Sequence, residues 1–248
     1  MTGIVHLVGA GPGSPDLLTV RAARLLGEAD IVFHDALVPQ GILKLMKKAV
    51  LVSVGKRHGR HSTAQHFINK RLLEAARQCK VVVRLKGGDP MLFGRAQEEI
   101  EYLKKHRIRV EIVPGITSAL AASAQLGISL TRRGVSRSVV FATPRAGEGE
   151  ERSAWARAVA AADTAALYMA AHDAEAVRDE LLRAGLSPET PVVAAENVSL
   201  AGEKTTCFLL KELSALKNEG PVLLLFGEVF AQEVEVRVRN VRTTSQAA

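Results

Sequence analysis

Residues 84–95, RLKGGDPMLFGR, bring together residue types that could hold a ligand and do chemistry on it. The adjacent glycines Gly87 and Gly88 let the backbone take a positive φ and let a ligand approach the main chain, and Pro90 fixes the exit direction. The turn therefore has a defined shape, with the carboxylate of Asp89 at its centre. Three cations flank it: Arg84, Lys86 and Arg95. This density of positive charge is costly beside a buried strand unless an anion shares the space; the alternative is an ordinary strand-to-helix turn.

Further candidate groups follow other apolar runs. Asp35 comes directly after residues 31–34, and Lys56 follows residues 50–54. Ligands of parallel sheets bind outside the carboxyl ends of the strands, so these groups should meet Asp89 in one cleft. The alternatives are that the aspartates cap turns and that the lysine is a solvated surface charge. The convergence of several strand ends favours a ligand site.

Other kinds of site fit the sequence less well. The loop at residues 9–13, GAGPG, lacks the third glycine of a dinucleotide-binding fingerprint, and its proline removes an N–H that a pyrophosphate would use. His58, His61 and His66 lie close together, but no nearby carboxylate completes a metal site, so we interpret them as surface or substrate-facing histidines. The sequence has no strand-to-helix G-x-S-x-G motif, which excludes the common serine hydrolases.

The composition is that of a globular protein with an excess of positive charge. The 248 residues are 47% hydrophobic, enough to bury one large core or two modest ones, and their net charge is +7. The positive charge should attract anions. Aromatic residues make up only 4% of the chain and the basic residues form no single tract, which argues against a nucleic-acid partner.

Membrane insertion and secretion are not expected. No apolar run is long enough to span a bilayer, and residues 1–11 lack the basic region of a signal peptide. Cys79 and Cys207 are the only cysteines, so neither a disulfide framework nor a cysteine zinc site is expected. These features predict a protein of the reducing cytoplasm without a metal centre.

The first half of the chain follows a rhythm of strand, loop and helix. Runs rich in Val, Ile and Leu predict strands over residues 4–8, 31–34, 50–54, 81–85 and 110–113. Helical patterns lie between them, and the first such helix should run to about Leu26 with Ser14 as N-cap and Pro15 as first helical residue. Continuous apolar strands separated by helices predict a mostly parallel sheet covered on both faces.

The second half predicts a mixed α/β domain with some antiparallel pairing. Strands are expected over residues 138–142, 165–169, 192–196, 205–210 and 222–226. An alanine-rich helix and a helix near residues 174–184 lie between the strands. The expected domains are residues 1–116 and 117–240, followed by a polar tail at residues 241–248.

Six motifs of the first half arrive in the order of one family: VGAGPGSPDLLTVRA (8–22), HDALV (34–38), VGKRHG (54–59), VVRLKGGDPMLFGR (82–95), VPGITSA (113–119) and GISLTRR (127–133). The second half adds ALYMA (166–170) and PVVAAEN (191–197). Through these motifs the chain resembles the uroporphyrinogen-III C-methyltransferases of the tetrapyrrole methylase family over nearly its whole length.

The resemblance implies a tetrapyrrole methylase fold, in which two α/β domains hold the active site in the cleft between them, and a homodimer. It implies S-adenosyl-L-methionine as cofactor, with S-adenosyl-L-homocysteine as its product, and a polycarboxylate tetrapyrrole as small-molecule substrate. The implied reaction converts uroporphyrinogen III to precorrin-2 by C-methylation at carbons 2 and 7, toward sirohaem and cobalamin. A polyanionic substrate agrees with the positive net charge.

The matched motifs also imply roles for single residues. Cofactor contacts are expected at Pro12, Gly87, Gly88, Asp89, Leu92, Thr117, Ser118, Met169 and Val198, the last of which stands where the family usually has a glycine. Catalytic roles are expected for Asp35 as proton acceptor, Lys56 as proton donor, Arg95 and Glu98. Substrate contacts are expected at Arg95, Glu98 and Arg133. Because arginine rarely gives up its proton, Asp35 is the better general base.

Several positions depart from the family pattern: His34, Ala96, Gln97, Arg132 and Ala170. They lie mainly on the substrate side, which leaves two alternatives open. One is methylation of a later precorrin, and the other is a non-catalytic module that binds cofactor or tetrapyrrole. The intact Asp35, Lys56, Arg95 and Glu98 favour catalysis.

Overall fold

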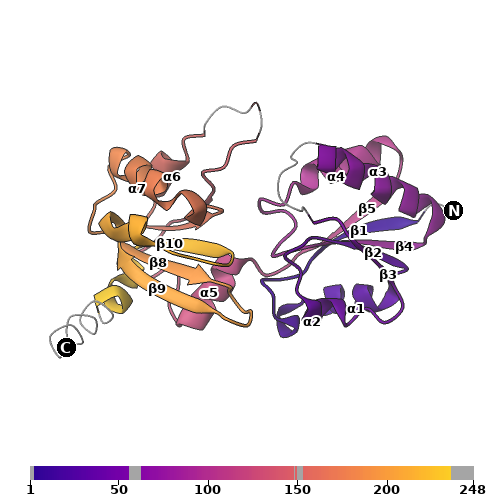
Figure 1. The fold of residues 1–248 in the computed structure, drawn as a ribbon, viewed down its shortest axis with the longest axis horizontal. Helices are drawn as coiled ribbons and strands as arrows, with labels where there is room; N and C mark the ends of the chain where they lie inside the picture. Colours follow the sequence, from indigo (N-terminus) through magenta and orange to yellow (C-terminus); the bar gives the residue numbers. More distant parts are fainter. Residues whose placement is uncertain (1–2, 56–62, 148, 150–152, 236–248) are drawn as a thin grey trace. The chain divides into compact units, whose positions relative to one another are not determined.

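The computed structural model describes residues 3–55, 63–147, 149 and 153–235. The chain forms two compact units, Met1–Ser118 and Ala119–Ala248, which we call the N-terminal and C-terminal units (Figure 1). The division falls after residue 118, against an expected division after residue 116. Each unit is an α/β domain with one five-stranded sheet, as the sequence predicts.

The sheet of the N-terminal unit is fully parallel and has the strand order β3-β2-β4-β1-β5. Its strands are β1 (Ile4–Gly9), β2 (Ile31–His34), β3 (Val50–Ser53), β4 (Val81–Lys86) and β5 (Arg109–Val113). Strand β4 is central, between β2 and β1, so both of its edges are hydrogen-bonded and both of its faces are covered. This strand carries the first cations of the segment at residues 84–95.

Helices cover both faces of this sheet. One face packs against α1 (Val20–Glu28) and α2 (Gln40–Leu43), and the other packs against α3 (Thr63–Gln78) and α4 (Ala96–Lys105), as Figure 1 shows. Side chains alternate along a strand, so Val83 and Leu85 of β4 join the core on the α1 side, and Val82 joins the core on the α3 side. The same alternation turns Arg84 and Lys86 toward α3 and α4.

The first helix differs from the sequence prediction. Residues Pro15–Leu17 form only a short 3-10 turn, and α1 begins at Val20 after an extended Leu18 and Thr19. The hydroxyl of Thr19 accepts a hydrogen bond from the Ala22 N–H at 3.2 Å, whereas the hydroxyl of Ser14 donates to the carboxylate of Asp16. Thr19 is therefore the N-cap of α1, and the prediction of Ser14 as its cap was wrong because the Ser14 hydroxyl is engaged with Asp16.

The C-terminal unit contains a mixed sheet with the order β6-β7-β10-β8-β9. Its strands are β6 (Val139–Ala142), β7 (Thr164–Tyr168), β8 (Pro191–Glu196), β9 (Lys204–Leu209) and β10 (Val222–Gly227). Strands β6 and β7 pair in parallel, and the other pairs are antiparallel, as the expected mixed topology requires. Because β7 and β8 both run antiparallel to β10, their carboxyl ends lie at the same edge of this sheet.

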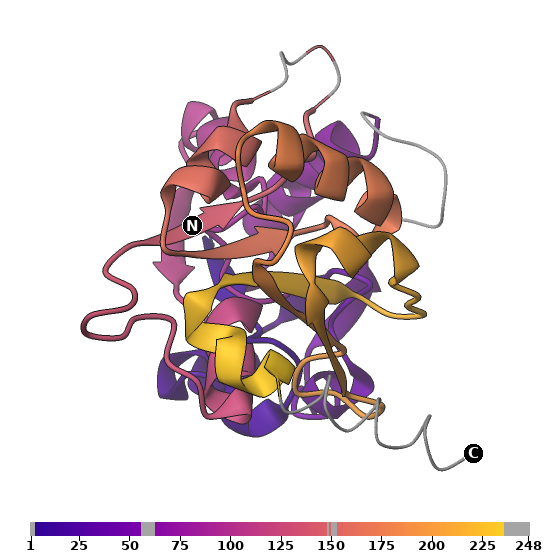
Figure 2. The ribbon, with the colours of Figure 1, turned by 90° about the vertical axis from the view of Figure 1, so that its left-hand side faces the viewer.

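Two helices cover one face of the second sheet. Helices α6 (Trp155–Ala161) and α7 (Ala174–Arg183) share a core with β7, β8 and β10 and lie above the strands in Figure 2. Helix α5 (Ser118–Leu126) begins at the last residue of the N-terminal unit. Among the described residues, no helix combines the length and the apolar character needed to cross a membrane.

Candidate active site

Loops at the carboxyl ends of the parallel strands are tied together by their backbones. The loop after β1 and the turn after β4 form an isolated antiparallel bridge, in which the Gly88 N–H donates to the Gly11 carbonyl at 2.7 Å. The Asp35 N–H donates to the Leu85 carbonyl at 3.3 Å, which ties the end of β2 to β4. The ends of β1, β2 and β4 therefore lie together in the N-terminal unit.

Close packing of glycines permits this arrangement. A Cβ at Gly9 would lie 2.6 Å from Cα of Gly115, and a Cβ at Gly115 would overlap the carbonyl oxygen of Gly88. Gly87 is different: among the described residues, a Cβ there would meet within 4 Å only Cβ of Leu37, at 3.8 Å. Gly88 has a φ of 66°, which favours glycine. The turn thus leaves the main chain at Gly87 open to a ligand.

The carboxylate of Asp89 holds the turn in place. Its Oδ1 accepts a hydrogen bond from the Met91 N–H at 2.8 Å, and its Oδ2 accepts one from the Gly115 N–H at 2.9 Å. The side chain therefore caps the turn after β4 and connects it to the loop after β5. These contacts are those expected of an aspartate that caps a turn, the alternative role that the sequence left open for Asp89.

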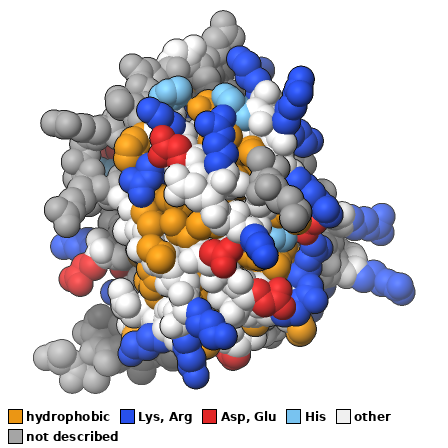
Figure 3. Space-filling view, turned by 90° about the vertical axis from the view of Figure 1, so that its right-hand side faces the viewer, with side chains coloured by type: hydrophobic (Ala, Val, Ile, Leu, Met, Phe, Trp, Pro, Cys, Tyr) orange, Lys and Arg blue, Asp and Glu red, His pale blue; other side chains and the backbone are white. Residues whose placement is uncertain are grey.

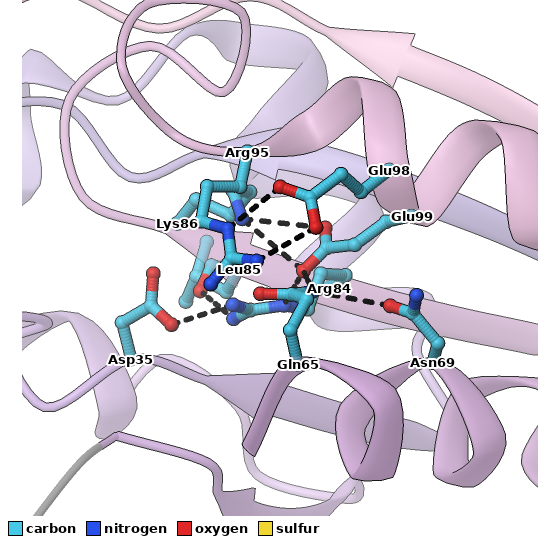
Figure 4. A network of polar contacts seen from close by, with 9 residues as sticks. All are labelled: Asp35, Gln65, Asn69, Arg84, Leu85, Lys86, Arg95, Glu98 and Glu99. Carbon is cyan, nitrogen blue, oxygen red and sulfur yellow. Dashed lines mark hydrogen bonds and ion pairs between the residues drawn. The ribbon is translucent and has the colours of Figure 1, made fainter. Parts of the chain in front are cut away.

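A buried polar network lies beneath the turn, between β4, α3 and α4 (Figure 4). It consists of Gln65, Asn69, Arg84, Lys86 and Glu99. Oε1 of Glu99 accepts hydrogen bonds from Nε of Arg84 at 3.0 Å, Nε2 of Gln65 at 3.1 Å and Nζ of Lys86 at 3.2 Å. Nζ of Lys86 also donates to Oε2 of Glu99 at 3.2 Å. The anion expected beside the cations of β4 is thus supplied by the protein itself.

Asp35 lies at the edge of this network. Nη2 of Arg84 donates to Oδ1 of Asp35 at 2.6 Å, while Nη1 of Arg84 donates to the Leu85 carbonyl at 3.2 Å. The Arg84 and Glu99 side chains are 3% and 0% exposed, whereas the Asp35 side chain is 31% exposed. Arg84 therefore connects a fully buried carboxylate to one that solvent reaches.

Charge and burial act differently on the two cations of β4. Burial alone lowers the pKa of Arg84, but the carboxylates of Glu99 and Asp35 outweigh it and raise that pKa above its ordinary value. For Lys86, burial is the largest influence, and together with the nearby charge of Arg84 it lowers the pKa in spite of Glu99. Arg84 is thus the more firmly charged member of the network.

Arg95 and Glu98 form a separate, exposed ion pair at the start of α4. Nε and Nη2 of Arg95 each donate to an oxygen of Glu98 at 2.7 Å, which is a bidentate arrangement. The hydrogen bond from Arg95 is the main reason that the pKa of Glu98 lies below its ordinary value. Arg95 has a φ of 55° and Phe93 has a φ of 52°, a left-handed conformation that is rare for these residues. Strain of this kind is concentrated at functional sites.

The remaining predicted residues are distributed over both units. In the N-terminal unit, Pro12 and Leu92 are half-buried, and Thr117 and Ser118 follow β5 at the start of α5. In the C-terminal unit, Met169 follows β7 and Val198 follows β8, so both lie at the edge where these strands end.

Met169 and Val198 differ in exposure. Met169 has a φ of 57° and is 45% exposed, whereas Val198 is buried. Arg133 is exposed in the turn closed by the bridge between Arg132 and Ser136. Lys56, His58 and His61 lie outside the described residues.

The ring of His66 packs edge-on against Tyr102 of α4, with 6.1 Å between ring centroids. Within the described part of the chain, no group of three or more His, Cys, Asp or Glu side chains is placed to hold a metal ion. On the face of the N-terminal unit shown in Figure 3, Lys and Arg side chains are mixed with acidic and apolar ones.

Glu99 is the residue that the sequence reasoning missed. The buried residues of α4 are Ala96, Glu99, Ile100 and Leu103, which follow the spacing of one helix face. A glutamate on the apolar face of α4, beside a strand with two buried cations, was the signal that could have revealed the network.

Comparison with known proteins defines the class of this molecule. Residues 5–214 match the family model described as Tetrapyrrole (Corrin/Porphyrin) Methylases. The chain belongs to this family of two-domain α/β proteins.

Two curated relatives have a similar level of identity. The chain is 43% identical over 234 residues to a uroporphyrinogen-III C-methyltransferase of Pseudomonas aeruginosa, covering 92% of this chain and 95% of that protein. It is also 43% identical over 234 residues to a siroheme synthase of Saccharophagus degradans, covering 92% of this chain and 51% of that protein. The chain thus spans about half the length of the siroheme synthase.

Solved structures show the same fold. A crystal structure of uroporphyrin-III C-methyl transferase from Thermus thermophilus, complexed with S-adenyl homocysteine, matches with a TM-score of 0.82 and 38% identity. The match covers 92% of this chain and 99% of that one. A cobalt precorrin-4 methyltransferase matches with a TM-score of 0.78 and 28% identity, over 91% of this chain and 95% of that one. The expected tetrapyrrole methylase fold is confirmed.

Proposed function

We propose that this protein is an S-adenosylmethionine-dependent methyltransferase that converts uroporphyrinogen III to precorrin-2 by C-methylation at carbons 2 and 7. The observation that supports this most is the 43% identity to the uroporphyrinogen-III C-methyltransferase of Pseudomonas aeruginosa, over 95% of that protein. The product would serve sirohaem and cobalamin-type synthesis. We further propose, from the family resemblance, a homodimer, and from the sparse cysteines, a cytoplasmic location.

The turn after β4 has features suited to the cofactor. S-Adenosylmethionine, when bound, supplies an electrophilic methyl group on a sulfonium, and it has no phosphate that would require a basic loop. The open main chain at Gly87 and the tether made by Asp89 present a shaped backbone surface. We assign cofactor contacts to Pro12, Gly87, Gly88, Asp89, Leu92, Thr117 and Ser118 of the N-terminal unit, and to Met169 and Val198 of the C-terminal unit.

The chemistry requires alignment and removal of a proton, with no covalent nucleophile from the protein. An electron-rich pyrrole carbon attacks the methyl group, and the proton on that carbon must then leave. Asp35 is our candidate base because its carboxylate is partly exposed at a strand end beside the turn. Lys56 follows the neighbouring strand β3, and we assign it as proton donor on the matched motif alone.

The substrate side should recognise a flat, apolar ring with carboxylates at its periphery. Arg95, Glu98 and Arg133 are exposed, and the arginines are suited to carboxylates. Large apolar side chains are also exposed in the loops after β2 and β4: Leu37, Met91 and Phe93. Exposed apolar groups beside charged ones are common at ligand-binding surfaces. Glu98 pairs with Arg95, so substrate carboxylates would have to compete for its guanidinium.

Methylation of a later precorrin is the second candidate. The cobalt precorrin-4 methyltransferase shares the fold at 28% identity, and the departures at Ala96 and Gln97 lie beside the proposed substrate residues. A module that binds without catalysis is a third candidate, although the presence of Asp35, Arg95 and Glu98 favours an enzyme.

Methyl transfer separates the three candidates. The protein is incubated without oxygen with uroporphyrinogen III and methyl-labelled S-adenosylmethionine, and the tetrapyrrole is analysed by mass spectrometry and carbon NMR. We expect two labelled methyl groups, at carbons 2 and 7. If uroporphyrinogen III stays unlabelled but a later precorrin, supplied in a parallel incubation, gains the label, the second candidate is favoured. Cofactor binding without methyl transfer to either acceptor would favour the third.

A further inference from the structure

The side chain of Arg84 has an unusual set of partners for a residue in the middle of a sheet. On one side Nε binds Oε1 of Glu99 at 3.0 Å, and on the other Nη2 binds Oδ1 of Asp35 at 2.6 Å (Figure 4). The Nη1 donor is held by the Leu85 carbonyl at 3.2 Å. The planar guanidinium is therefore fixed in three directions, and Asp35 is the only one of these partners with a substantially exposed side chain.

Glu99 and its direct partners fix Arg84 in turn. Glu99 is fully buried and is also held by Lys86 and Gln65, at 3.2 and 3.1 Å. Gln65 donates a further hydrogen bond to Oδ1 of Asn69 at 3.1 Å. Side chains locked by such neighbours can hold a functional group in one geometry. A continuous chain of hydrogen bonds therefore links α3 and α4, through Arg84 of β4, to the carboxylate of Asp35 after β2.

Stability alone is a weak explanation for this arrangement. Taking charges out of water is costly, and a buried ion pair is often no more stabilising than apolar residues of similar volume. Apolar residues at positions 84, 86 and 99 could fill the same space, but they would provide no contact to Asp35. What the charged pair adds is a rigid donor at a partly exposed carboxylate.

We infer that Arg84 is a positioning residue for the reaction, one that orients the Asp35 carboxylate through Oδ1 and is itself held by Glu99. This inference rests on the proposed function, in which Asp35 accepts the proton of the methylated ring carbon. With Oδ1 engaged by Arg84, that proton goes to Oδ2, and the electron pair of the broken C–H bond returns to the ring.

Arg84→Lys is the informative variant because it keeps the positive charge. A lysine is a compact point charge and cannot bind two carboxylates through a fixed fork. We expect kcat to fall about 10²-fold, the typical effect of a small misplacement of a catalytic group. The KM for S-adenosylmethionine should stay near that of the wild type, since the turn that we assign to the cofactor is retained.

Asn69→Ala is the matched control. Asn69 is buried in the same network but contacts Gln65, so that Gln65, Glu99 and Arg84 stand between it and Asp35. Its loss should lower the melting temperature and leave kcat near the wild-type value. In the Asp35→Asn background, Arg84→Lys should cause almost no further loss of kcat, because the group that it positions is gone.

Either of two results would overturn the inference: wild-type kcat in Arg84→Lys, or equal losses of kcat in Arg84→Lys and Asn69→Ala. Failure of the proposed function is a separate outcome, seen as an inactive wild type. The contact itself is then tested by chemical denaturation. The stability losses of Arg84→Lys and Asp35→Ala should be non-additive when combined, and strict additivity would overturn the positioning contact without any activity assay.

Discussion

Glu98 and Glu99 are neighbours on α4, and both pair with an arginine of residues 84–95, yet their surroundings are opposite. The Glu98 side chain is 49% exposed and binds Arg95, which is 47% exposed. The Glu99 side chain is 0% exposed and binds Arg84, which is 3% exposed. Successive residues of a helix point about a quarter-turn apart, and here that difference separates solvent from the core.

The contrast shows how burial determines what an ion pair can do. The exposed pair lies in a high dielectric, so the attraction between its members is weak, and a ligand carboxylate can replace Glu98 on Arg95. The buried pair cannot lose one member without leaving an uncompensated charge. We therefore interpret Arg95 and Glu98 as the adaptable side of the site, and Arg84 and Glu99 as its fixed side.

Glu99→Gln should give the largest effect on stability. The substitution keeps the shape but removes the negative charge between Arg84 and Lys86, and breaking a buried pair in this way costs about 3–5 kcal/mol. Chemical denaturation of the variant should give a free energy of unfolding that is lower by that amount. Glu98→Gln is the matched control on the next residue. A loss below about 1 kcal/mol for Glu99→Gln, within the range of surface pairs, would contradict the account.

Asp89→Ala tests a half-buried carboxylate between these extremes. Both oxygens accept backbone hydrogen bonds, so their loss leaves the N–H groups of Met91 and Gly115 to find other partners, at a cost of about 1–3 kcal/mol. Because the turn is also our candidate cofactor site, calorimetry should show weaker binding of S-adenosylmethionine. Arg95→Ala should instead lower turnover at unchanged cofactor affinity. The same loss of affinity in both variants would refute this division of roles.

The pH dependence of stability should reveal the burial of Lys86. Its pKa is lowered from the ordinary 10.5, mainly by burial, so the unfolded chain binds more protons than the folded one between the lowered value and 10.5. Stability therefore gains from Lys86 as the pH rises through that interval. Relative to Lys86→Met, the wild type should become more stable as the pH rises toward 10.5. A difference that is constant with pH would show that the lysine behaves as an exposed one.

Glu98→Gln should give the smallest effect, about 0–1 kcal/mol at neutral pH, and added salt should reduce it further. Arg95 lowers the pKa of Glu98 from its ordinary 4.5, so the stabilisation exists above that value and disappears as the pH falls through the lowered one. Denaturation of wild type and variant at low and high salt measures this difference. A salt-independent loss as large as that of Glu99→Gln would erase the contrast between the two glutamates.

The sequence was sufficient for the order of elements and for the strand ends that carry Asp35 and Asp89, because Val/Ile/Leu runs and glycine-rich turns are local signals. The start of α1 was predicted wrongly, since Ser14 and Thr19 are both acceptable caps and only the observed contacts of their hydroxyls decide between them. The role of Glu99 could not be read locally either. It depends on α4 packing against β4, which brings together residues from different elements.

Asp35 is the proposed base at the end of β2, and the rate of labelled methyl transfer to uroporphyrinogen III in Asp35→Asn tests this role most directly. Asparagine keeps the size of the side chain and can still accept from Arg84, but it cannot take a proton at neutral pH. With cofactor saturating, we expect the rate to fall about 10²- to 10⁴-fold relative to the wild type, the range of general-base catalysis. A rate within about twofold of the wild type would contradict the assignment.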